Sequence, residues 1–212
     1  MEFGDVHIRQ LTPADAAAYR AIRLAGLKQN PEAFGSTFQA EFARPLAWFF
    51  GRLSESTVFG AFRDSEILGV AGFAARTTEK EAHKGLLWGM YVRPEARGTG
   101  VARRLVEAVI ELARARVEVL QLSVVVGNER AQRLYAGLGF VEYGIERNSL
   151  KYDGRYFDEV LMALDLASGV PAEAASGIAI ARTGDTDGVP PQLAEQQSVS
   201  GVLHLGIRSF RR

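Results

Sequence analysis

Residues 91–102 constrain the fold of this chain more than any other segment. They read Tyr-Val-Arg-Pro-Glu-Ala-Arg-Gly-Thr-Gly-Val-Ala and join a hydrophobic run, 86–92, to a long amphipathic run. A strand that leads into a helix in this way leaves the first amides of the helix unpaired, at the positive end of its dipole. Gly98 and Gly100 have no side chain to keep an anion from the main chain, and Arg97 adds a positive charge. The segment therefore predicts a phosphate-binding joint between a strand and a helix.

Two common phosphate loops fit these residues poorly. A Walker loop ends in Gly-Lys-Ser or Gly-Lys-Thr, and neither triplet occurs in the chain. The dinucleotide fingerprint G-x-G-x-x-G begins well at Gly98 and Gly100, but Arg103 stands where a small residue should pack the helix against the strand. The acidic residue expected about 20 positions later would be Glu118, which precedes the next predicted strand instead of following it.

A third pattern fits better. Residues 97–102, Arg-Gly-Thr-Gly-Val-Ala, match R/Q-x-x-G-x-G/A, the signature with which the GNAT superfamily of N-acetyltransferases binds the diphosphate of acetyl-CoA. Residues 90–95, Met-Tyr-Val-Arg-Pro-Glu, resemble the hydrophobic-V-x-P-E segment that precedes it in that family. Residues 128–140 then contain every fixed position of a second family motif, N-x-R-A-x-x-L-Y-x-x-x-G-F. The chain thus resembles the GNAT superfamily over roughly residues 5–166.

Composition limits the other possibilities. The 212 residues suffice for one domain with a substantial core, and 25 basic residues balance 25 acidic ones, so nothing indicates a nucleic acid or a membrane surface as partner. The chain has no cysteine, which excludes disulfides, thiolate metal sites and cysteine nucleophiles, and we expect no metal. No apolar run approaches the ~20 residues of a membrane span and no signal peptide is recognisable, so we expect a cytoplasmic protein.

Hydrophobic periodicity predicts the element order β-α-α-β-β-β-α-β-α-β-β. Strands are expected over 6–11, 56–62, 67–75, 86–92, 119–126, 140–145 and 156–166, and helices after 12–15, over 38–53, after residue 100 and after Asn128. Because the run 119–126 is nearly all apolar, that strand should be buried on both faces. The resemblance implies an α/β fold with a mixed, mostly antiparallel central sheet flanked by helices, and a V-shaped splay between two central parallel strands.

The acetyltransferase domain is predicted to span residues 1–167. The extension 168–212 is rich in Gly, Ser, Pro and Thr and has a single aromatic residue, Phe210, so we expect it to be flexible. Its segment 202–207 could form a terminal strand on an exposed sheet edge. Together with the aromatic run 48–50, that segment favours a homodimer.

The resemblance also implies which residues hold acetyl-CoA. Main-chain groups of Met90, Tyr91 and Val92 would bind the pantetheine arm as an added strand, and an amide near Tyr91 or Val92 would stabilise the oxyanion. The expected cofactor-binding residues are Met90, Tyr91, Val92, Arg97, Gly98, Thr99, Gly100, Val101, Ala102, Arg103, Asn128, Ala131 and Tyr135.

Tyr135 matches the position of the family's general acid, which protonates the departing CoA thiolate. A tyrosine with an ordinary pKa near 10 stays protonated at neutral pH and can donate that proton. Asn128 is predicted to cap the helix of the second motif, and the resemblance implies that it also contacts pantetheine. The general base stays unassigned because the strand 86–92 contains no acidic residue; the candidates are Glu32, Glu41, Glu79, Glu81, Asp158, Glu159 and His83.

Two functional hypotheses follow. In the first, the chain moves an acetyl group from acetyl-CoA to a primary amine of a small molecule or a protein, by direct attack in a ternary complex. In the second, it is a non-catalytic acyl-CoA-binding or sensing module, which the missing strand glutamate favours and the retained Tyr135 disfavours. The acceptor would bind near residues 30–42 and 148–157.

Overall fold

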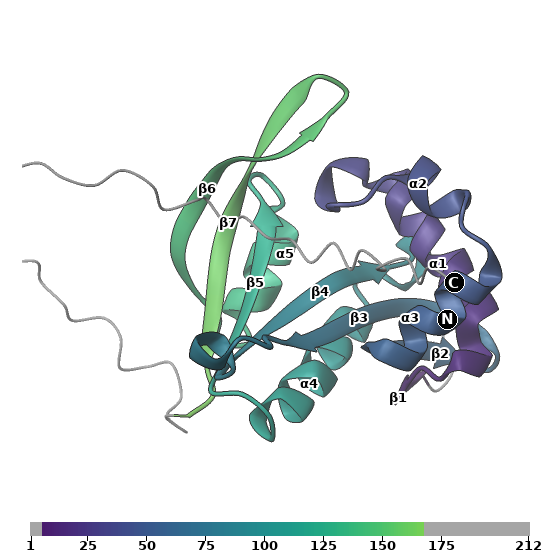
Figure 1. Cartoon of the computed structure of the whole chain (residues 1–212), viewed down its shortest axis with the longest axis horizontal. Helices are drawn as coiled ribbons and strands as arrows, with labels where there is room; N and C mark the ends of the chain where they lie inside the picture. Colours follow the sequence, from purple (N-terminus) through teal and green to yellow (C-terminus); the bar gives the residue numbers. More distant parts are fainter. Residues whose placement is uncertain (1–5, 168–212) are drawn as a thin grey trace, which may run out of the picture. The chain divides into compact units, whose positions relative to one another are not determined.

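The computed structural model describes residues 6–167 (Figure 1). The predicted extension 168–212 and its strand at 202–207 lie outside these residues. One seven-stranded sheet has the order β1-β2-β3-β4-β5-β7-β6. Its strands are β1 (Val6–Gln10), β2 (Thr57–Arg63), β3 (Glu66–Ala75), β4 (Lys84–Val92), β5 (Val119–Val125), β6 (Val141–Tyr152) and β7 (Arg155–Asp165). The α-helices are α1 (Ala16–Gln29), α2 (Phe38–Phe42), α3 (Leu46–Glu55), α4 (Val101–Arg114) and α5 (Glu129–Ala136), and the 3-10 turns are η1 (Pro13–Asp15), η2 (Pro31–Ala33), η3 (Glu79–Glu81) and η4 (Pro94–Ala96).

The central pair of strands forms the predicted splay. β4 and β5 are the parallel pair of the sheet, and their register extends only from Lys84 opposite Val119 to Leu86 opposite Gln121. Beyond that point the two strands separate, as Figure 1 shows. The other neighbouring pairs are antiparallel. The predicted mixed, mostly antiparallel sheet with a V-shaped splay is confirmed.

A β-bulge bends β4 on its separated part. The register with β3 runs from Trp88 opposite Gly72 to Tyr91 opposite Val70, so Gly89 and Met90 together face one residue of β3. Gly89 has a φ of +65°, which a residue with a side chain adopts only under strain. The bulge follows from a glycine inside a strand, and it redirects the backbone toward the mouth of the splay.

The two faces of the sheet carry separate hydrophobic cores. The larger one lies under α4 and α5, where Leu105 and Leu120 are fully buried. The second lies under α1 and α3 and includes Ile22 and Phe49, also fully buried. Helices therefore flank the sheet on both sides, as expected of a sheet with an apolar residue on each face of its middle strands.

Two expectations about local structure are wrong. The single helix over 38–53 is interrupted, because Pro45 at the N-cap of α3 lacks the amide that a continuous helix needs. β5 is only partly covered on its second face: Leu120, Leu122 and Val124 are buried on the first face, whereas the second face carries the exposed Ser123 beside the buried Val125.

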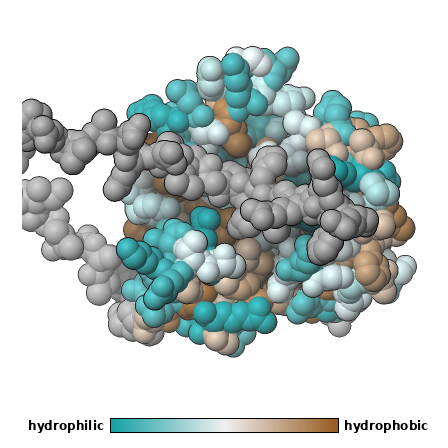
Figure 2. All heavy atoms as spheres, viewed as in Figure 1, coloured by the Kyte–Doolittle hydropathy of each residue, from teal (hydrophilic) through white to brown (hydrophobic). Residues whose placement is uncertain are grey.

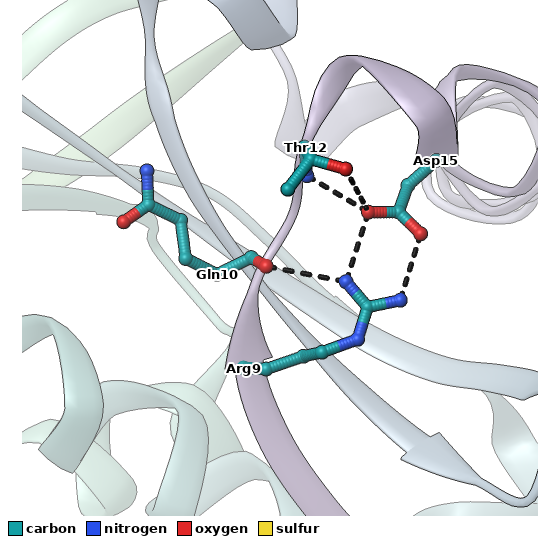
Figure 3. A network of polar contacts seen from close by, with 4 residues as sticks. All are labelled: Arg9, Gln10, Thr12 and Asp15. Carbon is teal, nitrogen blue, oxygen red and sulfur yellow. Dashed lines mark hydrogen bonds and ion pairs between the residues drawn. The ribbon is translucent and has the colours of Figure 1, made fainter.

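An ionic corner fixes the start of α1 (Figure 3). Arg9 donates two hydrogen bonds to the carboxylate of Asp15, 2.7 and 2.8 Å long. Asp15 also accepts from the amide of Thr12 at 2.8 Å, which is half of a capping box. Thr12, Pro13 and Asp15 thus begin the helical segment as the sequence predicted, with one 3-10 turn before α1.

Within residues 6–167 no helix is both long and apolar enough to cross a bilayer. At the top of the view in Figure 2, the tip of the β6–β7 hairpin is hydrophilic. The cytoplasmic location and the homodimer stay predictions.

Candidate active site

The predicted phosphate joint lies at the end of β4, beside the splay. η4 follows β4, and Gly98 and Gly100 then take left-handed conformations, with φ of +83° and +86°. Gly100 is the N-cap of α4 and offers no side chain to the first amides of the helix. No atom of residues 6–167 would lie within 4 Å of a Cβ placed on Gly100, so this part of the chain leaves the space above these amides open. An uncapped helix start with open space beside it can bind an anion.

Side chains of the joint hold the loop in shape. The Thr99 hydroxyl donates to the carbonyl of Ala96 at 2.7 Å, and Arg97 Nε donates to the carbonyl of Val92 at 3.1 Å. Arg97 therefore ties the loop to the end of β4 while its guanidinium lies about 6.0 Å from the centre of the Tyr91 ring. These contacts preorganise the loop, so an anion does not have to order it.

The second motif meets the first at this place. Asn128 accepts a hydrogen bond from the Ala131 amide at 3.2 Å and caps α5, as predicted. A Cβ on Gly98 would lie 3.9 Å from Arg130 Nη2, so the exposed Arg130 brings a positive charge to the loop. Arg103 instead forms an ion pair with Glu107 at 2.9 Å.

Arg130 is a site residue that the sequence left undecided. The second motif fixed its position, but only the packing of α5 beside the loop shows that it reaches the phosphate joint. The side chains of the other predicted cofactor-binding residues are less accessible to a ligand. Val101 is buried in the core under α4, Ala102 and Ala131 are partly buried against that core, and Met90 packs on the same core.

The main-chain groups of β4 point alternately to β3 and to the splay, and on the splay side the Val92 carbonyl accepts from Arg97 Nε. Arg93 donates its amide to the carbonyl of Leu68 in β3 at 2.9 Å. Because main-chain groups alternate between the two edges of a strand, those of Val92 point to the open edge and those of Tyr91 point to β3. The Tyr91 side chain belongs to the core under α1, and its hydroxyl donates to Gln29 Oε1 at 2.9 Å. Of the two expected oxyanion donors, the Val92 amide is the one that faces the splay.

Tyr135 lies on the inner face of α5. It is 5% exposed, and its ring makes an edge-to-face contact with Phe140, with centroids 5.8 Å apart. Its hydroxyl makes no hydrogen bond to another residue within 6–167. Burial raises the pKa of Tyr135 above its ordinary value, because the phenolate would lose its hydration. The hydroxyl is therefore a protonated donor without a partner in the described chain.

The candidate bases differ in where they lie. Glu79 and Glu81 belong to η3, before the start of β4 and far along the chain from its bulge. Asp158 accepts from the Asn148 amide at 2.8 Å and pairs with Arg147. Glu41 is paired with Arg23 in the interior. These partners occupy the carboxylates of Asp158 and Glu41.

Glu159 lies on the face of the sheet that α1 covers. Its neighbour Val160 points into the core under α4, so alternation directs Glu159 to the opposite face. Ser123 donates to Glu159 Oε1 at 2.8 Å and Ser149 donates to Oε2 at 2.6 Å. On the same face, η2 reaches across to contact β5 and β6. Glu159 is thus a half-buried carboxylate on the β5 side of the splay.

The comparisons with known proteins agree with this geometry. The model of the acetyltransferase (GNAT) family matches residues 25–140. An L-methionine sulfoximine/L-methionine sulfone acetyltransferase from Pseudomonas paraeruginosa is 28% identical over 140 residues, which are 65% of this chain and 81% of that protein.

Two solved structures are also similar. The ribosomal-protein-alanine N-acetyltransferase from Brucella melitensis has 28% identity and a TM-score of 0.62, over 75% of this chain and 99% of that one. The Salmonella typhimurium protein yncA, solved with its cofactor acetyl-CoA, has 23% identity and a TM-score of 0.65, over 81% of this chain and 100% of that one. The chain belongs to the GNAT family of acetyltransferases. It is an acetyl-CoA-dependent N-acetyltransferase.

Proposed function

We propose that the chain transfers the acetyl group of acetyl-CoA directly to a primary amine, with Tyr135 as the general acid. The observation that carries this proposal is the meeting of two helix starts at the splay: the uncapped amides of α4 and the Gly98 loop lie beside Arg130 of α5. A site with several amides and arginines around an open space suits a diphosphate.

The residues present fit acetyl-CoA along its length. Gly98, Gly100 and the first amides of α4 would hold the diphosphate, with charge from Arg130. The open edge of β4 near Val92 would bind the pantetheine arm by main-chain hydrogen bonds, in the manner of an added strand. Bound in this way, acetyl-CoA supplies a thioester as the acetyl donor. Asn128 is committed to its cap through Oδ1 and retains its amide nitrogen for a ligand.

The chemistry needs two proton transfers. The amine nitrogen bonds to the thioester carbon, the carbon–sulfur bond breaks, and the sulfur takes the proton of the Tyr135 hydroxyl. Because the pKa of Tyr135 is raised, its hydroxyl stays protonated at neutral pH. The proton is transferred only as the sulfur acquires negative charge. The Val92 amide would stabilise the oxyanion.

The proton that leaves the amine needs an acceptor on the face where the amine enters. Glu159 suits that role better than Glu41 and Asp158, whose carboxylates are paired with arginines, because its hydrogen-bond partners are neutral serines and it lies on the face of β7 turned away from α4. Two serine donors fix the carboxylate without neutralising its charge. We propose that Glu159 takes the proton, directly or through one water.

The relatives do not agree on an acceptor. One is named for the amino acid analogues L-methionine sulfoximine and L-methionine sulfone, and another for an alanine of a ribosomal protein. We propose that the acceptor is a primary amine of a small molecule or a protein. A thiol-release assay with acetyl-CoA and a panel of amino acids, other small amines and peptide N-termini tests this, with mass spectrometry of the product. Binding of acetyl-CoA without turnover of any amine would contradict the proposal and favour a sensing module.

A further inference from the structure

A buried ion pair lies beside the bulge of β4. Arg23, on α1, donates from Nε and Nη2 to the carboxylate of Glu41, on α2, with Nη2 to Oε1 at 2.8 Å and Nε to Oε2 at 3.1 Å. Both side chains are largely shielded from water, with exposed fractions of 10% and 8%. Glu41 therefore occupies one side of the guanidinium, the side formed by Nε and Nη2.

Residues 6–167 provide no hydrogen-bond partner for the other side of the same guanidinium. Arg23 Nη1 is buried and makes no hydrogen bond within residues 6–167. It points to the bulge, because a Cβ placed on Gly89 would lie 3.6 Å from it. A buried N–H group without a hydrogen-bond partner is unfavourable, so its presence beside the β4 bulge indicates that a ligand pairs with it. The edge formed by Nη1 and the second hydrogen of Nη2 matches the spacing of a carboxylate.

A second arginine adds positive charge at the same segment of β4. The guanidinium of Arg52, on α3, lies between two indole rings, 5.1 Å from the centre of Trp48 and 5.2 Å from that of Trp88. Its Nε is also buried without a hydrogen-bond partner in the described residues. Trp88 directly precedes Gly89. Arg23, Glu41 and Arg52 together carry one net positive charge, so the Glu41 carboxylate does not cancel the cluster.

Arg23 and Arg52 both lie close to the Tyr19 side chain. Burial raises the pKa of Tyr19, on α1, and the positive charges of Arg23 and Arg52 oppose that rise. Both guanidinium groups are thus close enough to a single side chain to influence its ionisation.

We infer that Arg23 and Arg52 bind an anionic group of the acceptor, so that the acceptor is a free amine that also carries a carboxylate, as an α-amino acid does. The inference rests on the proposed function, and it identifies the substrate class of that site. A lysine side chain of a protein has no carboxylate in this position and would leave Nη1 unpaired. Because Nη1 has no surface open to water, the half-buried Phe34, whose ring centre is 4.9 Å from the guanidinium carbon, shifts when the acceptor enters.

The test compares each amino acid with its own C-terminal amide, which keeps the amine and the side chain but lacks the negative charge. The thiol-release assay gives kcat/KM for both members of each pair. We expect the purified chain to prefer the acid over the amide by about 30-fold or more for its best substrate, since a lost charge-assisted hydrogen bond costs about one to two factors of ten.

Variants then locate the preference. Arg23→Met alone would leave the buried Glu41 charge unpaired, so the informative variant is the double substitution Arg23→Met with Glu41→Gln. We expect its preference for the acid to fall below about threefold, while the amide is still acetylated. Arg23→Lys, which keeps the charge but loses Nη1, should lower the preference by about tenfold and serves if the double variant does not fold. Arg20→Met, which removes a half-buried arginine of the same helix that donates instead to the Phe42 carbonyl, should keep the full preference.

The outcomes separate the two proposals. Equal kcat/KM for acids and amides in the unaltered chain overturns the carboxylate inference and leaves the acetyltransferase function intact. A preference that persists in the double variant and in Arg23→Lys also overturns it. If no amine is acetylated although acetyl-CoA binds, the proposed function fails and the inference fails with it. Because both substrates are measured on each variant, a partial loss of folded protein cancels in the ratio.

Discussion

Replacing Tyr135 with phenylalanine separates catalysis from folding. The substitution removes one hydroxyl oxygen and keeps the edge-to-face contact of the ring with Phe140. The hydroxyl makes no hydrogen bond within residues 6–167, so its removal leaves no donor or acceptor in that part of the chain unpaired. The free energy of unfolding should therefore change by less than about 0.5 kcal/mol, where loss of a satisfied hydrogen bond would cost about 1 kcal/mol. The corresponding shift in Tm is at most about 2 °C.

The rate should respond very differently. A positioned general acid contributes about 10²–10⁴-fold to a reaction, and water can replace part of that contribution. We expect kcat to fall at least about 30-fold, which corresponds to about 2 kcal/mol of transition-state stabilisation. The affinity for acetyl-CoA should persist, because the proposed binding groups are main-chain amides and arginines.

The raised pKa of Tyr135 adds a dependence on pH. The folded-state pKa lies above the unfolded value near 10, so the stability from the buried neutral form is complete below pH 10. It is lost as the pH rises through the folded-state pKa. The activity should accordingly show no loss from ionisation of Tyr135 at any pH below about 10.

The assay is thiol release at saturating acetyl-CoA, combined with calorimetry for binding and thermal unfolding for stability. Tyr143→Phe is the control, since Tyr143 lies on β6, is 55% exposed and, within residues 6–167, only accepts a hydrogen bond from Gln121. Its activity should equal that of the unaltered chain. Full activity of Tyr135→Phe would refute the assignment of the general acid, and so would an equal loss in the Tyr143 control.

Three further predictions address the joint, the α1 corner and the core. Gly100→Ala places a side chain at a φ of +86°, and no described residue lies close to it, so the strain of about 1–2 kcal/mol comes from the backbone alone. We expect acetyl-CoA to bind about 5- to 30-fold more weakly in calorimetry. Unchanged affinity would show that the loop does not need this conformation. The guanidinium of Arg9 holds the pKa of Asp15 well below its usual range, so the ion pair of Asp15 stabilises the fold above about pH 4 and this contribution is lost as the pH falls further. The difference in Tm between the unaltered chain and Asp15→Asn should therefore shrink below pH 4. A difference that stays constant would contradict this account. Leu105→Ala leaves a cavity at a fully buried position and should lower the free energy of unfolding by about 2–5 kcal/mol in denaturant unfolding. Leu46→Ala, at a half-exposed position, should lower it by less than about 0.5 kcal/mol. Similar losses of stability in both variants would contradict the described core.

Much of the fold was predictable because its patterns are local. The alternation in 6–11, the two strands on either side of the turn at 63–66 and the amphipathic run after Gly100 each define an element from neighbouring residues alone. The helix over 38–53 was mispredicted because its apolar spacing outweighed one proline at position 45. β5 was mispredicted because an apolar sequence does not say whether both faces of a strand are covered.

The site was predictable only where a motif fixes it. The glycines of the joint and the Asn128 cap follow from short-range patterns, and the structure shows them in the expected conformations. The bulge at Gly89, in the strand before the joint, also has a local signal, a glycine in the middle of a strand. The pairing of Arg23 with Glu41 had none, since the two residues are 18 positions apart and meet only through the packing of α2 on α1.

The most direct measurement for the central claim is a pair of calorimetric titrations, one with acetyl-CoA and one with S-acetylpantetheine, which carries the same thioester and arm but no diphosphate. If the amides that begin α4 and the neighbouring Arg130 grip the diphosphate, acetyl-CoA binds and S-acetylpantetheine binds at least about 100-fold more weakly. Equal affinities for the two compounds, or no heat with acetyl-CoA, would contradict the account.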